Sequence, residues 1–145
     1  MHRMSIAKTL NPYLSDLVVM YLKLHDLHWN VKGMQFVPVH QYTETLYMDM
    51  TLKFDAVAEL IIMQGEKPVS NMKDYLELAD VKEVSKDFYR DEEVLKIVLD
   101  DLILLKDKAS AIHESCADNY SVTTMMEEHI AFYDKEIWFL RSMMA

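Results

Sequence analysis

Glycine and proline are scarce in this chain. Only 2 of its 145 residues are Gly and 3 are Pro. An all-β sandwich or barrel needs turn residues about every 8 to 12 positions, and most phosphate-binding loops depend on glycine. The scarcity argues against both and favours long helices.

Cysteine is almost absent, because Cys116 is the only one. No disulfide can form within the chain, and cysteine-rich zinc sites are excluded. No apolar run approaches the roughly 18 residues of a membrane span, and the opening residues Met1 to Lys8 do not resemble a signal peptide. We therefore expect a soluble, cytoplasmic protein with no membrane partner.

Positive charge is in deficit. The 15 Lys and Arg residues against 24 Asp and Glu give a formal net charge of −9. This balance opposes unaided binding to nucleic acid or to an anionic membrane, and it favours attraction of cations. Hydrophobic residues make up 51% of the chain, as in a globular protein. The length fits one domain spanning residues 1–145.

Apolar residues recur at three- and four-residue steps in four long segments. The pattern predicts a first helix from Asn11-Pro12 to Gly33, a loop over 34–39 and a second helix up to Gly65. It then predicts a short helix capped by Ser70 and a third long helix from Asp91 to near Cys116. A fourth long helix follows a capping box at Thr124 and Glu127. A long connection joins the second and third helices, whereas the other connections are short. This arrangement predicts an all-α, ferritin-like four-helix bundle with a short helix in the long connection.

Two histidines and two carboxylates stand out as candidate metal ligands. His28 lies at the end of the first predicted helix and His40 at the start of the second, with Asp55 and Glu59 further along the second. Imidazole nitrogen and carboxylate oxygen suit iron, manganese or zinc. Glu44, four residues after His40, shares its helix face. Each residue taken separately also has an ordinary structural explanation, as a surface or core side chain.

Helix geometry prevents these groups from meeting within one chain. Asp55 lies 15 residues beyond His40, which is roughly 22 Å at about 1.5 Å per residue. A two-fold partner would bring its own Asp55 and Glu59 beside His28 and His40, giving two equal sites per pair. The usual site inside a four-helix bundle needs Glu-x-x-His pairs, and the sequence has none. Any metal centre is therefore expected between subunits.

These residues also carry a family resemblance. The sequence resembles the Dps family of mini-ferritins in the run His28-Trp29-Asn30-Val31-Lys32-Gly33, in Phe36, His40 and Asp55-Ala56-Val57-Ala58-Glu59, in Gly65, Pro68 and Tyr75-Leu76-Glu77, and in Lys135-Glu136-Ile137-Trp138. The resemblance extends over nearly the whole chain. The separations of 12, 15 and 4 residues between the candidate ligands are its most specific part.

The resemblance implies an activity and an assembly. Members of the family form hollow dodecamers, bind Fe(II) at ferroxidase centres across two-fold interfaces, oxidise it preferentially with hydrogen peroxide, and store Fe(III) inside. Carried over, His28 and His40 are catalytic metal ligands from one subunit, and Asp55 and Glu59 are those of its partner. The centre would then hold one or two irons and protect against oxidative damage.

Two neighbours of these ligands take their roles from the same resemblance. Trp29 is expected beside the metal without binding it. Glu44 is expected as a ligand or water-mediated contact near a second iron. Many members have Asp at this position, so the longer side chain departs from the family pattern. The resemblance therefore does not define the occupancy or the geometry of the second iron site.

DNA binding is the alternative function. Family members that condense DNA often use Lys- and Arg-rich tails, whereas the segment before Asn11 contains only Arg3 and Lys8. We therefore do not expect direct DNA binding, although a DNA-coating nucleoid protein with little ferroxidase activity stays as the alternative. A helical scaffold without catalysis is a third possibility, and the complete ligand set argues against it.

The remaining notable residues have structural interpretations. We expect His2, His25, His113 and His129 to be structural or exposed, although His25 lies one turn before His28 and could contribute to the site. Cys116 is expected to be a small buried residue. The aromatic residues Phe54, Tyr133, Trp138 and Phe139 are interpreted as core, and the acidic residues Asp118, Glu127 and Glu128 as solvated helix ends rather than pore residues.

Overall fold

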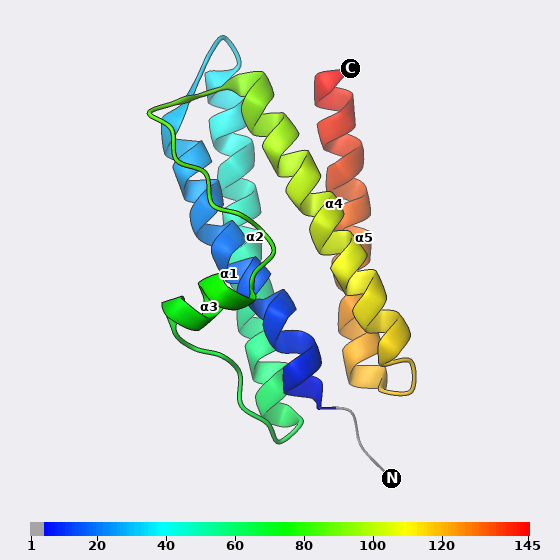
Figure 1. The fold of residues 1–145 in the computed structure, drawn as a ribbon. Coiled ribbons are helices and arrows are strands. Elements are labelled where there is room, and N and C mark those ends of the chain that lie inside the picture. Colours follow the sequence, from blue (N-terminus) through cyan, green and yellow to red (C-terminus); the bar gives the residue numbers. More distant parts are fainter. Residues whose placement is uncertain (1–4) are drawn as a thin grey trace.

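Within residues 5–145, four long helices form two packed pairs (Figure 1). α1 (Ile6–Asn30) packs along α2 (Phe36–Met63), and α4 (Asp91–Ser115) packs along α5 (Tyr120–Met144). The computed structural model describes residues 5–145, so the expectations for His2 and Arg3 lie outside the described residues. The short helix α3 (Met72–Leu78) lies between α2 and α4. The predicted all-α architecture, with one small helix in its long connection, is confirmed.

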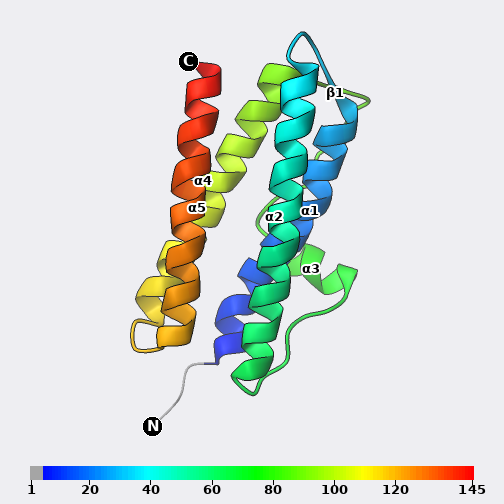
Figure 2. The same cartoon turned by 180° about the vertical axis from the view of Figure 1, so that it is seen from behind.

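The long connection makes α2 and α4 begin at the same end of the bundle. It runs back along α1, with α3 packed against that helix (Figures 1 and 2). Near its end, the strand β2 (Tyr89–Arg90) pairs in parallel with β1 (Val31–Lys32). These strands were not predicted from the sequence, because two residues per strand are too few to show a periodic pattern. The pair ties the turn between α1 and α2 to the start of α4.

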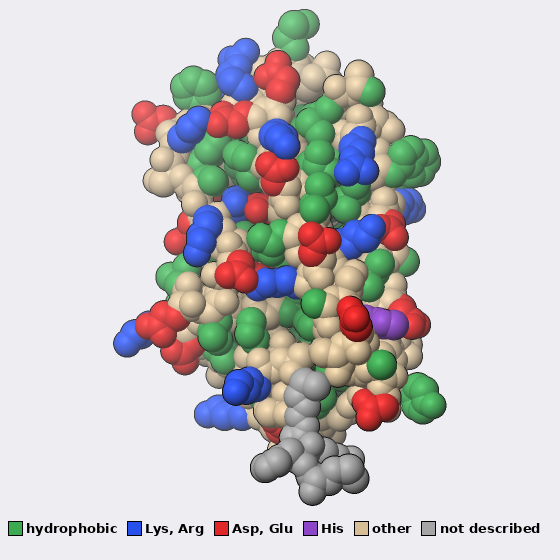
Figure 3. Space-filling model, turned by 45° about the vertical axis from the view of Figure 1, so that its right-hand side comes forward, with side chains coloured by type: hydrophobic (Ala, Val, Ile, Leu, Met, Phe, Trp, Pro, Cys, Tyr) green, Lys and Arg blue, Asp and Glu red, His purple; other side chains and the backbone are tan. Residues whose placement is uncertain are grey.

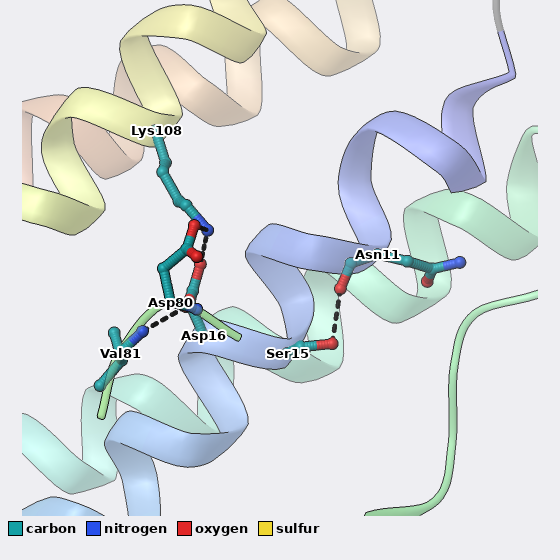
Figure 4. Close-up of polar contacts among 6 residues, drawn as sticks. All are labelled: Asn11, Ser15, Asp16, Asp80, Val81 and Lys108. Carbon is teal, nitrogen blue, oxygen red and sulfur yellow. Dashed lines mark hydrogen bonds and ion pairs between the residues drawn. The ribbon is translucent and has the colours of Figure 1, made fainter. Parts of the chain in front are cut away.

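A buried carboxylate fixes the middle of this connection (Figure 4). Asp16 on α1 is 0% exposed, and its Oδ1 accepts the backbone N–H groups of Asp80 at 2.7 Å and Val81 at 2.9 Å. Its Oδ2 pairs with Lys108 on α4. Burial by itself lowers the pKa of Lys108, but its bonds to the Asp16 and Asp80 carboxylates outweigh burial and hold that pKa above its usual value. The connection is thereby anchored to both helix pairs.

The prediction that the first helix begins at Asn11-Pro12 is wrong. α1 begins at Ile6, because the Ser5 hydroxyl caps its first turn and the Glu66 carboxylate accepts the backbone N–H of Ile6 at 2.9 Å. Pro12 lies inside the helix. Glu66 follows the far end of α2 in the sequence, so no local pattern could reveal this cap.

The predicted loop over 34–39 is also wrong, because α2 already begins at Phe36. Pro38 is the third residue of the helix, where its missing N–H has no intrahelical acceptor to lose. The backbone N–H of Gln35 donates to Oδ2 of Asp91 at 2.9 Å. A tertiary contact therefore sets this helix start as well.

Two further helix starts differ from the prediction. Asn71 rather than Ser70 caps α3, and Asn119 rather than a capping box at Thr124 and Glu127 precedes α5. Each Asn side chain accepts the backbone N–H three residues later, at 3.0 and 3.2 Å. Asn is as good an N-cap as Ser or Thr, so sequence patterns alone did not separate the candidates.

The core lies between the two helix pairs and consists mainly of Leu, Val, Met and Tyr side chains. Cys116 is buried, as predicted, and Tyr133 is fully buried. Trp138 contradicts its interpretation as a core residue, because it is 62% exposed. Across residues 5–145, none of the helices has the length and apolar character needed to cross a bilayer.

Candidate metal centre

His28 and His40 lie together where α1 turns into α2. His28 is in the last turn of α1, and His40 is in the second turn of α2. The hairpin between the helices places the two imidazole rings in a stack, with centroids 3.7 Å apart and planes 11° from parallel. The structure thus brings together the two histidines that lie 12 residues apart in the sequence.

Each histidine is held by the backbone of the other. Nδ1 of His28 lies 2.6 Å from the carbonyl oxygen of His40, and Nδ1 of His40 lies 2.8 Å from the carbonyl oxygen of His28. A carbonyl only accepts, so both Nδ1 atoms carry the hydrogen and donate. In the neutral rings the lone pair is then on Nε2, and neither Nε2 has a hydrogen bond within residues 5–145. Backbone bonds of this kind orient metal-binding histidines.

The surroundings keep His28 available as a ligand. It is 5% exposed. Burial lowers its pKa, the hydrogen bond to the His40 carbonyl acts in the opposite direction, and the nearby His40 ring lowers it further, with a net pKa below the usual value. His28 is therefore neutral at pH 7 and can offer a nitrogen lone pair.

Two residues that were not predicted from the sequence also contact the histidine pair. The Thr43 hydroxyl lies 3.2 Å from Nδ1 of His28, and the Tyr47 ring meets the His28 ring edge-on at 5.2 Å. The Tyr47 hydroxyl donates to Glu44 at 3.3 Å. Thr43 and Tyr47 lie three and seven residues after His40 on α2, so helical spacing from His40 was the signal that could have identified them.

Asp55 and Glu59 form a second group on the outer side of α2. Both are exposed. A hydrogen bond to the Asp55 side chain, together with the charge of Asp55, raises the pKa of Glu59. The two carboxylates thus face each other one turn apart, as their spacing predicted. Two adjacent carboxylates of like charge are suited to bind a cation between them.

The histidine pair and the carboxylate pair are far apart in one chain. His40 and Asp55 lie on the same unbroken helix α2, which separates them by roughly 22 Å. No three His, Cys, Asp or Glu side chains gather as a metal site in the part of the chain that the structure describes. One chain therefore presents two separate groups of candidate ligands.

The remaining predicted neighbours lie around the histidine pair. Trp29 is 62% exposed and tilts against His25, with ring centroids 5.3 Å apart. Nδ1 of His25 donates to the carbonyl oxygen of Tyr21 at 2.8 Å, because a carbonyl oxygen can only accept. His25 also stacks on Tyr47 at 3.7 Å. It therefore packs between Trp29 and Tyr47 beside the histidine pair, and its ring does not stack with His28.

The histidines outside the centre have other partners. His113 pairs with Glu127 at 2.7 Å near the turn between α4 and α5. His129 is buried and bonds to Tyr13. Neither histidine contacts His28 or His40, so both lie apart from the histidine pair.

Comparison with known proteins identifies the fold family. The ferritin-like domain family model matches residues 7–145. The DNA protection during starvation protein of Helicobacter pylori is 31% identical over 134 residues, covering 90% of this chain and 92% of that protein. The protein of the same name from Porphyromonas gingivalis is 34% identical, covering 93% and 86%.

Solved structures agree with these relatives. The crystal structure of a Dps protein from Bacillus brevis superposes with a TM-score of 0.92 at 28% identity, covering 99% of this chain and 100% of that one. The predicted ferritin-like bundle is therefore confirmed. On the strength of the family model, the relatives and the shared fold, this chain belongs to the Dps family of the ferritin-like superfamily.

Proposed function

We propose that this protein is a cytoplasmic ferroxidase and iron store that oxidises Fe(II) with hydrogen peroxide at centres shared between two subunits. His28 and His40 of one chain bind the iron together with Asp55 and Glu59 of its partner. The oxidised iron is held inside a hollow shell, a dodecamer, which protects the cell against oxidative damage. The observation that carries this proposal is the pair of stacked histidines with free Nε2 atoms and no further ligand gathered around them.

The surface around the carboxylates supports a partner chain. Asp55 and Glu59 lie among exposed apolar side chains of the same helix, with Met48 60%, Leu52 71% and Ile62 59% exposed. These residues follow one another at helical spacings of three and four, so they form one stripe along α2. An apolar stripe that encloses two carboxylates fits burial against a second copy.

The residues on this chain account for the chemistry in simple terms. Two ferrous ions supply the two electrons that reduce one peroxide to two waters, so no hydroxyl radical is released. The histidines provide neutral nitrogen donors in a fixed orientation, and the carboxylates favour the ferric product because they carry negative charge. Glu44, which accepts a hydrogen bond from the Tyr47 hydroxyl, is proposed to contact the second iron directly or through water.

DNA coating is the second candidate, and the names of the relatives motivate it. The net charge of −9 opposes it. On the face in Figure 3, Lys and Arg side chains alternate with Asp and Glu rather than forming a basic patch. We propose that direct DNA binding is not part of the function. A gel-shift assay at low salt checks this, because a retained complex at low ionic strength would favour the nucleoid role.

Complementation between two defective subunits tests the shared centre. One variant combines His28→Ala with His40→Ala, and the other combines Asp55→Ala with Glu59→Ala. Each is expected to lose most peroxide-dependent Fe(II) oxidation when assembled alone. In a random equal mixture, half of the pairs contain both variants and each such pair has one complete site, so about a quarter of the wild-type activity returns.

The control separates ligand loss from a general charge effect. Asp107→Asn removes an exposed carboxylate of α4 and is expected to oxidise iron at the wild-type rate. If the mixed assemblies recover no activity while both variants still pair, the ligands do not come from opposite chains and the proposal fails.

A further inference from the structure

A polar cluster lies in the core of the bundle, apart from the histidine pair. It consists of Tyr13 on α1 with His129 and Tyr133, one turn apart on α5. The three side chains are 1%, 6% and 0% exposed, respectively. Oη of Tyr13 lies 2.8 Å from Nδ1 of His129 and 2.5 Å from Oη of Tyr133. We call these three residues the Tyr–His cluster.

The hydrogen positions in the cluster follow from counting acceptors. The Tyr133 hydroxyl has Tyr13 as its only hydrogen-bond partner within residues 5–145. If Tyr133 donates to Tyr13, then Tyr13 donates to Nδ1 of His129, and every hydroxyl hydrogen is used. The reverse direction would leave the buried Tyr133 hydroxyl without an acceptor, which costs about 1–3 kcal/mol. The Tyr13 phenol therefore points its proton at a base.

Burial, more than the charges around the cluster, keeps Tyr13 and His129 neutral at rest. Burial, and to a smaller extent Lys53, lower the pKa of His129 to about 3. Burial also raises the pKa of Tyr13, as do the carboxylates of Asp16 and Asp49, against the effect of the Tyr133 hydrogen bond. Lys53 itself is paired with Asp49. The proton consequently stays on Tyr13 unless the phenol loses an electron.

We infer that the Tyr–His cluster is a one-electron redox site, in which Tyr13 is oxidised to a neutral tyrosyl radical while its proton moves to His129. The electron leaves to a one-electron oxidant such as the hydroxyl radical, which is reduced to hydroxide. The O–H bond of Tyr13 breaks and an N–H bond forms at Nδ1 of His129, giving an imidazolium. An electron from a reductant such as a thiol, with return of the proton, restores the resting cluster.

Burial makes the base essential. An oxidised phenol is a very strong acid, and water cannot take its proton in a dry core, so the reaction needs an acceptor already in hydrogen-bond contact. The pair gains one positive charge, which Asp16 and Asp49 favour and Lys53 opposes. A protective use of this site rests on the proposed function, because stray one-electron reduction of peroxide by Fe(II) would be the source of the radical.

Photochemical oxidation tests the redox site without iron. The assembled, iron-free protein is mixed with tris(bipyridine)ruthenium(II) and persulfate, flashed with light and frozen for electron paramagnetic resonance. The wild type is expected to give a long-lived tyrosyl signal, formed more slowly in D₂O than in H₂O. Tyr13→Phe removes the phenol, and His129→Gln keeps an acceptor but removes the base, so both are expected to lose the long-lived signal. Tyr120→Phe, which removes an exposed phenol, should retain it.

The Tyr133→Phe variant tests the redox site in a protein that keeps both Tyr13 and His129, so its result does not depend on whether the other two variants fold. It preserves the bond between Tyr13 and His129, so the long-lived signal should persist with a shifted g-tensor, because one hydrogen bond to the radical oxygen is gone. A purely structural role would not produce this shift. An unchanged long-lived signal in Tyr13→Phe, or in folded His129→Gln, overturns the inference. Because no iron is used, failure here is distinct from failure of the complementation experiment.

Discussion

At the scale of single residues, the histidines of this protein show how backbone contacts decide chemistry. His28 and His40 each donate through Nδ1 to the carbonyl of the other, so the orientation of one ring depends on the position of the other residue. His129 has the same ring but lies against Tyr13 in the core. We propose that the first two bind iron, whereas the third is held neutral by burial.

His129 gives the protein a defined dependence of stability on pH. The folded pKa of His129 is about 3 and lies below the unfolded value near 6.5. Between these two pH values, the unfolded chain binds a proton at this residue and the folded chain does not. Its contribution is complete above pH 6.5 and is lost as the pH falls towards 3. Between pH 7 and 5 the wild type should lose about 2 kcal/mol of unfolding free energy that His129→Gln does not lose.

Urea unfolding at a fixed subunit concentration measures this difference. Other titrating groups are common to both proteins and cancel in the comparison. If the stability gap between wild type and His129→Gln is constant from pH 7 to 5, the ring is not held neutral in the folded state.

At the scale of elements, tertiary contacts set where the helices start. The turn between α1 and α2 depends on Gly33, whose φ of 135° lies where other residues are strained. A Cβ atom at this position would collide with the Asp91 carboxylate, which also accepts the N–H of Gln35. This turn positions the histidine pair, so its geometry matters for the centre as well as for the fold.

Substituting Ala for Gly33 and for Gly65 separates the cost of backbone strain from the cost of a steric clash with Asp91. Gly65 also has a positive φ, 85°, but has open space around it. Gly65→Ala should lower the unfolding free energy by about 1 kcal/mol, from backbone strain alone, and Gly33→Ala by roughly 2–4 kcal/mol, since the Asp91 contact must also move. Chemical denaturation of both variants at neutral pH is the measurement. Equal losses would mean that the contact with Asp91 is irrelevant.

At the scale of the whole molecule, the proposed centre requires that the exposed stripe on α2 contacts a second chain. Leu52 is 71% exposed in the single chain and lies one turn from Asp55. Leu52→Lys should bury a charge in the interface between two chains, raising the dimer dissociation constant about a hundredfold or more, or roughly 3 kcal/mol. Sedimentation equilibrium should show monomers that keep their helical circular dichroism and lose iron oxidation.

A lysine added elsewhere provides the matched comparison. Ala111→Lys places the same charge on an exposed position of α4 and is expected to leave pairing intact. An undiminished dimer in Leu52→Lys would show that this part of α2 is not the contact surface.

The sequence by itself determined the helical class, the long connection between α2 and α4, and the identities and spacing of the candidate ligands. These follow from local periodicity and residue chemistry, which a linear pattern records directly. The position of Gly33 in the sequence also indicates that a short turn brings His28 and His40 to the same end of the bundle.

Only the tertiary structure decided the helix starts, the two reciprocal hydrogen bonds between His28 and His40, and the Tyr–His cluster. Glu66 caps α1 across 60 residues, and Tyr13 meets His129 across 116. A local pattern contains no information about which distant groups become neighbours, because those contacts form only when the helices pack. Thr43 and Tyr47 differ from these cases, because their helical spacing from His40 is a local signal, and the structure added only their contacts with His28.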